Sequence, residues 1–230
     1  VAALSPTAED FIIDPTVGSG GFLLEALFQG WKYIEQNYNP DLQDRHKLDF
    51  AKRHLYGIEI HRTLARICKT NLILHKDGHT NVQGNKSCLD TEFDLDRGLG
   101  DFDVVVGNPP FGDSIKEGDT DRLGDNHLSN FSLSRGKKMK AEIAITERAI
   151  DFLKPGGSLG FVLPDGILNN SGEQSNCPQM RRYLLRQGRI TGITSLPDHT
   201  FDQAGAQNKT SILFFQKYTE PEKEKFEESL

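Results

Sequence analysis

The 230-residue chain has few cysteines, no excess of positive charge and no long apolar run. Its cysteines, Cys68, Cys88 and Cys177, are odd in number, widely spaced and without metal-like pairing. They argue against a disulfide framework or a zinc site and fit a reduced cytoplasm. No apolar stretch approaches the length that spans a bilayer, so we expect no membrane partner. The net charge of −6 argues against a polycationic clamp for nucleic acid.

Short apolar runs alternate with longer stretches of helical periodicity, which is typical of an α/β domain with a mostly parallel sheet covered by helices. Strands are expected at residues 11–14, 54–58, 81–83, 102–106, 158–163, 190–196 and 211–216. Helices are expected at residues 21–36, 62–75, 140–153 and 178–187. The run Lys154-Pro155-Gly156-Gly157 is expected to stop the third helix.

Residues 112–138 differ from the rest of the chain. They are rich in Gly, Asp, Ser and Asn and have little periodicity. A loop of this length inside a compact domain is usually functional, disordered or both. We expect a mobile flap over a pocket, and an inert insertion is the alternative.

A glycine-rich stretch joins the first expected strand to the first expected helix. It reads Asp14-Pro15-Thr16-Val17-Gly18-Ser19-Gly20-Gly21-Phe22. Glycine lets a ligand approach the backbone without meeting a Cβ, and the following helix terminus offers unpaired N–H groups. The spacing departs from the dinucleotide fingerprint, and the Asp14 carboxylate would repel a pyrophosphate. A cationic or zwitterionic ligand therefore suits this turn, and a purely structural strand–helix turn is the alternative.

A second polar group follows the second expected strand, in the run Tyr56-Gly57-Ile58-Glu59-Ile60. A carboxylate at this place in a doubly wound domain can accept hydrogen bonds from both ribose hydroxyls. A solvated Glu59 at a strand end is the alternative. Because ligands in such sheets bind beyond the carboxyl ends of the strands, the two motifs together predict one site at that rim.

A third motif, Asn108-Pro109-Pro110-Phe111, follows an apolar run at residues 102–107. Neither proline has an N–H to donate, so the chain must leave the sheet here with fixed φ angles. The Asn108 side chain and the nearby carbonyls are then free to face a ligand beside an aromatic ring. The motif predicts a pocket for a flat, amine-bearing ring, and an ordinary strand-ending turn is the alternative.

In the order and spacing of these motifs, the chain resembles S-adenosylmethionine-dependent amino-methyltransferases. More narrowly, it resembles the modification subunits of type I restriction-modification systems, which are adenine-N6 DNA methyltransferases. The resemblance covers residues 11–218, and its further matches are Leu153-Lys154-Pro155-Gly156-Gly157, Val162-Leu163-Pro164-Asp165-Gly166 and Lys209-Thr210-Ser211-Ile212-Leu213-Phe214-Phe215. It implies a Rossmann-like class I methyltransferase fold, with a doubly wound, mostly parallel seven-stranded sheet whose last strand is antiparallel.

The resemblance also implies a role for each matching position. The residues that would hold S-adenosylmethionine are Asp14, Gly18, Ser19, Gly20, Gly21, Glu59, Ile60 and Asp90. Among them Glu59 would bind the ribose and Asp90 the adenine, with Asn85 as the alternative to Asp90. The catalytic residues would be Asn108, Pro109, Pro110 and Phe111. The Asn108 oxygen and the Pro109 carbonyl would each accept a hydrogen bond from one amine N–H of the target base, and Phe111 would stack on its ring.

The partners that the resemblance implies are double-stranded DNA with a flipped adenine, a specificity subunit, a second modification subunit and a restriction motor subunit. We expect residues 1–218 to form the catalytic domain without the family's amino-terminal helical segment, and residues 219–230 to lead into a further helix or linker. Two basic clusters are either phosphate contacts or solvated surface. They are Arg135, Lys137, Lys138 and Lys140, and Arg181, Arg182, Arg186 and Arg189.

Three other functions remain open from the sequence. Another amino-methyltransferase could use the same pocket for a protein glutamine amide, cytosine N4 or an RNA base, because each presents a planar N–H₂ group. A nicotinamide-dependent oxidoreductase would use the glycine-rich turn and Glu59, but it leaves residues 108–111 unexplained. A catalytically silent scaffold would keep the fold, although the intact pocket residues count against it.

Overall fold

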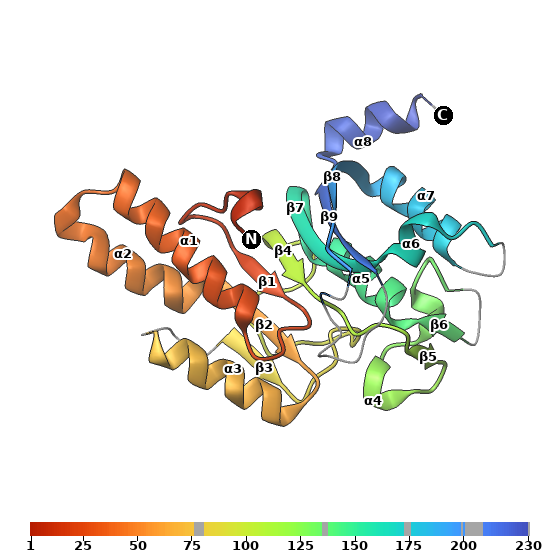
Figure 1. Cartoon of the computed structure of the whole chain (residues 1–230), viewed down its shortest axis with the longest axis horizontal. Coiled ribbons are helices and arrows are strands. Elements are labelled where there is room, and N and C mark those ends of the chain that lie inside the picture. Colours follow the sequence, from red (N-terminus) through yellow and green to blue (C-terminus); the bar gives the residue numbers. More distant parts are fainter. Residues whose placement is uncertain (76–80, 135–137, 173–175, 199, 201–208, 230) are drawn as a thin grey trace.

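A computed structural model describes residues 1–75, 81–134, 138–172, 176–198, 200 and 209–229. Its main sheet has seven strands in the order β3-β2-β1-β4-β7-β9-β8 (Figure 1). The strands are β1 (Ile12–Asp14), β2 (Leu55–Glu59), β3 (Val82–Gly84), β4 (Phe102–Gly107), β7 (Leu153–Pro164), β8 (Gly188–Ser195) and β9 (Thr210–Lys217). The longer helices are α1 (Gly21–Asn37), α2 (Pro40–Arg53), α3 (Arg62–Leu74), α5 (Ala141–Phe152), α7 (Cys177–Gln187) and α8 (Glu220–Glu227).

The strand order reverses beside β1, at the centre of the sheet. From β1 the chain builds outward through β2 and β3, and it then returns to place β4 on the other side of β1. The strands are parallel except β9, which is antiparallel to both β7 and β8. In a doubly wound sheet, ligands bind at the carboxyl ends of the strands that flank such a reversal. The fold therefore predicts a site beyond the ends of β1 and β4.

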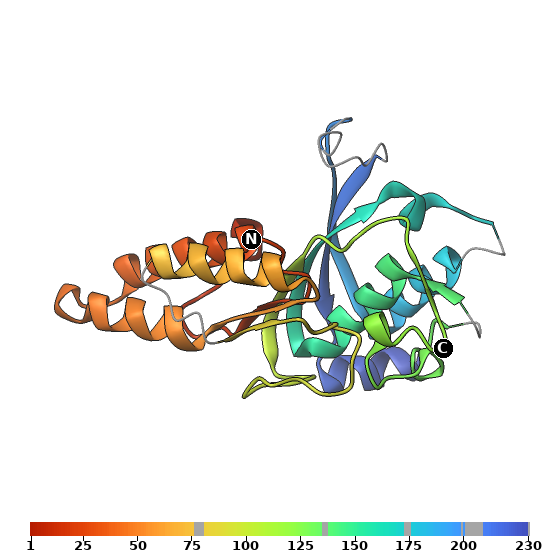
Figure 2. The same ribbon diagram turned by 90° about the horizontal axis from the view of Figure 1, so that it is seen from below.

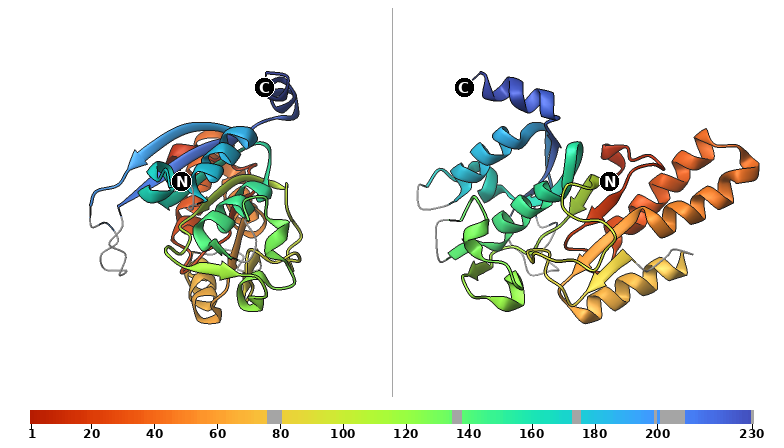
Figure 3. Two further views of the ribbon diagram at one scale, coloured as in Figure 1. Left: turned by 90° about the vertical axis from the view of Figure 1, so that its right-hand side faces the viewer. Right: turned by 180° about the vertical axis from the view of Figure 1, so that it is seen from behind.

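Helices cover both faces of the sheet. On β1 and β4, Ile12 and Val104 pack against α1 and α2, whereas the next residues, Ile13 and Val105, belong to the core that includes α5. This alternation follows from the two-residue period of a strand. Figure 2 shows α1, α2 and α3, coloured red to amber, grouped at one side of the sheet. Figure 3 shows α7 and α8 at the opposite end of the molecule.

The expected fold class is confirmed, because the sheet has seven strands and its last strand in sequence is antiparallel. All expected strands and helices are present with small shifts of their ends. Helix α2 was not predicted. The third expected helix ends at Phe152, but β7 begins at once at Leu153, so the Lys-Pro-Gly-Gly run lies within a strand rather than in a loop. None of the described helices has the length and apolar character needed to cross a bilayer.

Residues 112–134 are more ordered than the sequence predicted. They contain β5 (Ser114–Lys116), α4 (Thr120–Leu123) and a 3-10 turn, η3 (Leu128–Asn130), and β5 pairs with β6 (Lys138–Lys140). Ile115, Leu123 and Phe131 are buried in the main hydrophobic core. The sequence predicted no helix or strand in this segment, because its apolar residues are spaced irregularly and reach the core one at a time.

Candidate active site at the sheet rim

The glycine-rich turn leaves β1 and enters α1 through two left-handed backbone positions, Gly18 with φ 54° and Gly20 with φ 92°. A Cβ at Gly20 would also lie 2.8 Å from the Cys68 Sγ on α3. Position 20 therefore needs glycine both for its conformation and for the close approach of two helices. Gly21 opens α1, and its neighbouring N–H groups have no partner within the helix.

Asp14 ends β1 and is almost fully buried, with 1% of its surface exposed. Its Oδ1 accepts a hydrogen bond of 3.0 Å from the Thr16 amide. Its Oδ2 is buried and has no hydrogen-bond partner among the described residues. Burial raises the pKa of Asp14 from 3.8 to about 7, against the opposing effect of the Thr16 amide. A positive charge placed near Asp14 would favour its ionised form.

Glu59 ends β2 and joins two loops at the rim. Its Oε2 accepts from the Gly18 amide at 2.9 Å, and its Oε1 accepts from the His61 amide at 2.7 Å. Each oxygen retains a lone pair beyond these bonds. The carboxylate thus fixes the glycine-rich turn against the end of β2 and can still accept from a ligand. Ile60 follows it and is partly exposed beside the same cavity.

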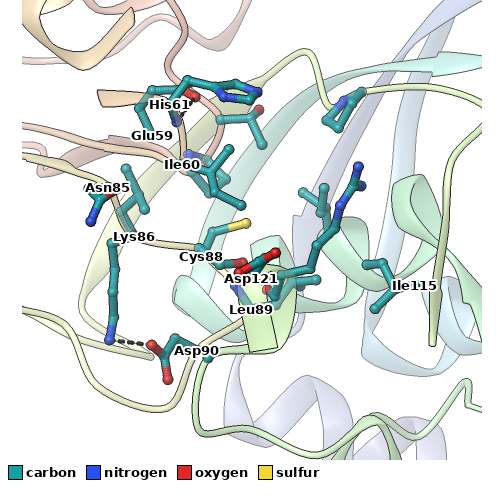
Figure 4. A pocket seen from close by; sticks show the side chains of 18 of the residues that line it. Glu59, Ile60, His61, Asn85, Lys86, Cys88, Leu89, Asp90, Ile115 and Asp121 are labelled. Carbon is teal, nitrogen blue, oxygen red and sulfur yellow. Dashed lines mark hydrogen bonds and ion pairs between the residues drawn. The ribbon is translucent and has the colours of Figure 1, made fainter. Parts of the chain in front are cut away.

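The two candidates for an adenine contact, Asn85 and Asp90, both follow β3. Asn85 is exposed and has a left-handed backbone with φ 59°. Asp90 is buried and forms an ion pair with Lys86 (Figure 4). Its Oδ1 also accepts from the Thr91 amide at 2.7 Å and from the Asp125 amide at 3.0 Å. Burial alone would raise the pKa of Asp90, but Lys86 and these amides hold the pKa below its usual value.

The Asn-Pro-Pro-Phe motif begins where β4 ends. Asn108 is half-buried, and its Oδ1 is fully buried without a hydrogen-bond partner among the described residues. Pro109 is buried, Pro110 is exposed and Phe111 is half-buried. At the preceding residue, Gly107, an added Cβ would lie 3.3 Å from the Asp14 Oδ1. The ends of β1 and β4 therefore bring the Asp14 carboxylate close to the start of the motif, as the reversal in strand order requires.

A cavity of about 800 Å³ opens at this rim, within the size range of small-molecule sites. Of the residues predicted from the sequence, its walls include Gly18, Glu59, Ile60, Asp90, Asn108 and Pro110, together with the alternative Asn85. The remaining predicted residues lie outside its walls: Asp14, Ser19, Gly20 and Gly21 in the first turn, and Pro109 and Phe111 in the motif. The structure thus gathers residues from four strand ends around one cavity.

Several cavity residues were not predicted from the sequence. Those near β2 and β3 include His61, Leu64, Lys86 and Cys88, and those beyond β4 include Asp113, Ile115, Arg122 and Ile145. Figure 4 labels His61, Lys86, Cys88 and Ile115 among them. The residues of the first group follow the ends of β2 and β3, which the sequence had already predicted to lie at this rim of the sheet. In the second group, Asp113, Ile115 and Arg122 confirm that the segment after the motif borders the pocket, but nothing in the sequence singled out these side chains.

The cavity is more acidic than basic. Its acidic side chains are Glu59, Asp90, Asp113 and Asp121, against Lys86 and Arg122. Lys86 is paired with Asp90, and Arg122 Nη2 is 2.7 Å from Asp113 Oδ2. The remaining charge is negative. Next to it lie the buried Asp14 Oδ2 and Asn108 Oδ1, which have no hydrogen-bond partner among the described residues. A buried acceptor left unpaired costs about 1–3 kcal/mol, so these residues fit a ligand that is positively charged and donates hydrogen bonds.

The second predicted basic cluster is divided between paired and exposed side chains. In the second cluster, Arg181 donates to the Ile167 and Asn170 carbonyls and Arg189 pairs with Glu222, which leaves Arg182 and Arg186 exposed. In the first, Arg135 and Lys137 lie outside the described residues, and Lys138 and Lys140 are exposed on β6.

Comparison with known proteins agrees with this geometry. A model described as N-6 DNA Methylase matches residues 1–226. The type I restriction enzyme StySPI methylase subunit of Salmonella potsdam is 29% identical over 219 residues, which are 94% of this chain and 38% of that protein. The chain spans 29 to 40% of the length of the first curated relatives that it matches.

Solved structures share the fold. The crystal structure of the type I restriction enzyme EcoKI M protein has a TM-score of 0.71 and 24% identity, over 95% of this chain and 42% of that one. A structure described as a putative class I S-adenosylmethionine-dependent methyltransferase from Listeria monocytogenes has a TM-score of 0.67 and 20% identity, over 92% of this chain and 54% of that one. These likenesses confirm the expected class I methyltransferase fold.

Proposed function

We propose that this chain, which belongs to the N-6 DNA Methylase family, transfers a methyl group from S-adenosylmethionine to N6 of adenine in DNA, as the catalytic part of a type I modification subunit. The observation that carries the proposal is the buried Asn108 oxygen at the end of β4, which has no hydrogen-bond partner within the described part of the chain. The preceding residue, Gly107, lies close to the Asp14 carboxylate. The proposal is also supported by the methylase subunits of type I restriction enzymes to which the chain is similar.

The residues at the ends of β1, β2 and β3 fit the cofactor. Asp14 and the turn formed by Gly18, Ser19, Gly20 and Gly21 would hold its methionine part, and Glu59 would accept from its ribose hydroxyls beside Ile60. Asp90 or Asn85 would contact its adenine. When bound, S-adenosylmethionine supplies an electrophilic methyl group on a sulfonium centre. The ionised Asp14 would favour this cation over the neutral product that remains after transfer.

The residues at the end of β4 would activate the target amine. The exocyclic amine of adenine is a weak nucleophile, because its lone pair is delocalised into the ring. Asn108 Oδ1 and the Pro109 carbonyl would each accept a hydrogen bond from one N–H of the amine, which draws the nitrogen toward tetrahedral geometry and localises its lone pair. The rigid Pro109-Pro110 step fixes these acceptors, and Phe111 would stack on the ring and hold its plane. Positioning of this kind can supply roughly 7–11 kcal/mol of the barrier.

The proposed reaction does not require a covalent intermediate. The only cysteine in the described cavity wall is Cys88, and burial raises the pKa of its thiol to about 12. The thiol therefore stays protonated at neutral pH and is a poor nucleophile. Direct transfer between two bound substrates is the simpler chemistry for these residues.

The target adenine must leave the DNA helix to reach the cavity, at a cost of a few kcal/mol. The net charge of −6 provides little attraction for a phosphate backbone, so we propose that other subunits supply most of the DNA contact. The partners are a specificity subunit, a second modification subunit and, for restriction, a motor subunit. A solved structure concerned with complex assembly of a type I restriction-modification system, 26% identical to this chain, supports such an assembly.

The alternatives receive no comparable support. A protein glutamine amide, cytosine N4 or an RNA base would fit the same acceptors, but the matching family model is that of N-6 DNA Methylase. If the chain were a nicotinamide-dependent oxidoreductase, the buried Asn108 oxygen, which has no partner among the described residues, would have no role in the reaction. A silent scaffold would not be expected to retain buried acceptors that lack protein partners, because they lower the stability of the fold.

The decisive test is expression of the complete gene with its neighbours, followed by mass spectrometry of nucleosides from host DNA. We expect N6-methyladenine with the wild-type gene and none with Asn108→Ala. Methylated cytosine, methylated RNA or methyl-glutamine in place of N6-methyladenine would overturn the substrate assignment.

A further inference from the structure

One wall of the cavity is made by two segments that bind each other. One is the loop after β3, residues 85–90, and the other is the segment around α4, residues 113–126. Ser87 Oγ donates to the Arg122 carbonyl, and the Asp125 amide donates to Asp90 Oδ1. These bonds join residues that are about 35 positions apart in the chain. The cofactor side and the target side of the proposed active site therefore share one wall.

Asp90 is at the centre of this wall. Its two oxygens together take the Lys86 ammonium and the Thr91 and Asp125 amides, so the carboxylate is already well occupied by the protein. Gly124 packs directly on it, because an added Cβ at position 124 would lie 2.1 Å from Asp90 Oδ2. Gly124 also has φ 56°, a conformation that side chains disfavour. The turn at residues 123–126 is thus shaped to sit on Asp90.

A second set of bonds secures the same turn. The buried Asn126 donates from Nδ2 to the Leu89 carbonyl at 2.8 Å, and Arg148 on α5 donates to that carbonyl at 3.3 Å. The Asn126 Oδ1 accepts from the His127 amide at 2.9 Å and from Asn130 at 2.6 Å. A fully bonded, buried amide holds a single conformation of its surroundings. The turn is fixed from two sides, by Asp90 and by Asn126.

We infer that Asp90 is a positioning residue for the target side of the cavity, and that Asn85 is the residue left to contact the cofactor adenine. This inference rests on the proposed function. Asp90 holds the 123–126 turn, and this turn places Arg122 and Asp121 at the cavity wall. Asn85 lines the same cavity, is exposed, and its side chain makes no hydrogen bond within the described part of the chain. An amide there can both donate to and accept from an adenine edge.

The test compares Asp90→Ala, Asp90→Asn, Gly124→Ala and Asn85→Ala. Hydrogen exchange of the purified chain reports on residues 123–128. The second measurement is methyl transfer by the chain co-expressed with its neighbours, from radiolabelled S-adenosylmethionine to DNA of a host that lacks the gene. It gives kcat and the KM values for DNA and for S-adenosylmethionine. Calorimetry gives the cofactor Kd. Gly124→Ala is the matched variant, because it keeps the Asp90 carboxylate in the chain but separates it from the turn, since the added Cβ must push the two apart.

We expect Asp90→Ala and Gly124→Ala to speed exchange at residues 123–128 and to raise KM for DNA about tenfold, the size expected for a lost bond to a charged group, with little change in cofactor Kd. Asp90→Asn should restore part of the loss, because its amide oxygen can still accept from Asp125. Asn85→Ala should raise the cofactor Kd and leave the exchange unchanged.

A tenfold rise of cofactor Kd in Asp90→Ala with unchanged exchange at residues 123–128 would overturn the inference. So would a Gly124→Ala chain that matches the wild type in exchange and in KM for DNA. A wild type that transfers no methyl group would instead contradict the proposed function. The exchange data would then still decide whether Asp90 holds the turn.

Discussion

The two sides of the cavity differ in how their polar groups are bonded. On the side of β2 and β3, Glu59 holds two backbone amides and Asp90 holds a lysine and two amides. At the end of β4, the Asn108 oxygen is buried with no partner among the described residues. Groups of the first kind fix the shape of the site before a ligand arrives. An acceptor of the second kind gains its hydrogen bond only from the ligand, and it is the better candidate for chemistry.

The largest effect that this comparison predicts is for Asn108→Ala. Removal of the acceptor should reduce the rate of methyl transfer by roughly 100-fold or more, as for other polar groups that stabilise a transition state, while cofactor binding survives. Single-turnover transfer and calorimetry measure the two separately. Asn85→Ala is the control, since it removes the same amide from the other side of the cavity and should not slow transfer at saturating cofactor. Normal turnover in Asn108→Ala would remove this residue from the active site.

Glu59→Ala should show the opposite pattern. It removes a charged acceptor from the Gly18 and His61 amides, and such bonds contribute about 1.5–3 kcal/mol. We therefore expect cofactor Kd to rise roughly 10- to 100-fold, with transfer retained at saturating cofactor. Calorimetry measures the affinity, and thermal unfolding serves to separate a local effect from a loss of the fold. A folded variant with unaltered cofactor affinity would exclude Glu59 from the cofactor site.

Phe111 lies outside the walls of the cavity, so its variants test whether the site for the target base extends beyond them. Phe111→Ala should weaken productive DNA binding by about 1–3 kcal/mol, the range for base stacking on an aromatic side chain. Phe111→Trp should have a milder effect, because it preserves a stacking surface. The measurement is kcat/KM for DNA in the assembled complex. Equal values for Phe111→Ala and wild type would show that no base stacks there.

The smallest expected effect is a pH dependence of cofactor affinity that arises from the titration of Asp14. Its ionised form favours a cationic cofactor, so affinity should rise with pH up to about 7, by at most about tenfold per pH unit. Stability should change in the opposite sense. The folded state keeps this proton from pH 3.8 to about 7 while the unfolded state does not, so the free energy of unfolding falls as pH rises through that window. Asp14→Asn should flatten both profiles, as calorimetry and denaturant unfolding would show.

The rim of the site could be predicted from the sequence because each motif lies directly after an apolar run. Strand ends in a parallel sheet meet at one rim, so Asp14, Glu59 and Asn108 come together whatever the loops do. The far wall could not be predicted. Ile115 and Ile145 reach the cavity through β5 and α5, and their side-chain directions depend on packing between segments that have no common periodicity.

Helix α2 was missed for a different reason. Its start carries recognisable signals, since Asn39 Oδ1 accepts from the Asp41 amide and Pro40 occupies the first turn. Its apolar stripe is weak, because only Phe50 and Ala51 are buried among its residues. A periodicity argument finds helices that bury a broad face, and α2 buries little more than its last turn.

The reversed direction of β9 has a practical consequence for labelling this protein. Because β9 starts beside Pro164 at the rim of the cavity and ends at Lys217, it carries the chain to the opposite rim before α8 begins (Figure 1). A fluorophore or an affinity handle placed after α8 would therefore be separated from the cavity by the full length of the sheet. A label at that position would not cover the cavity, which lies at the opposite rim.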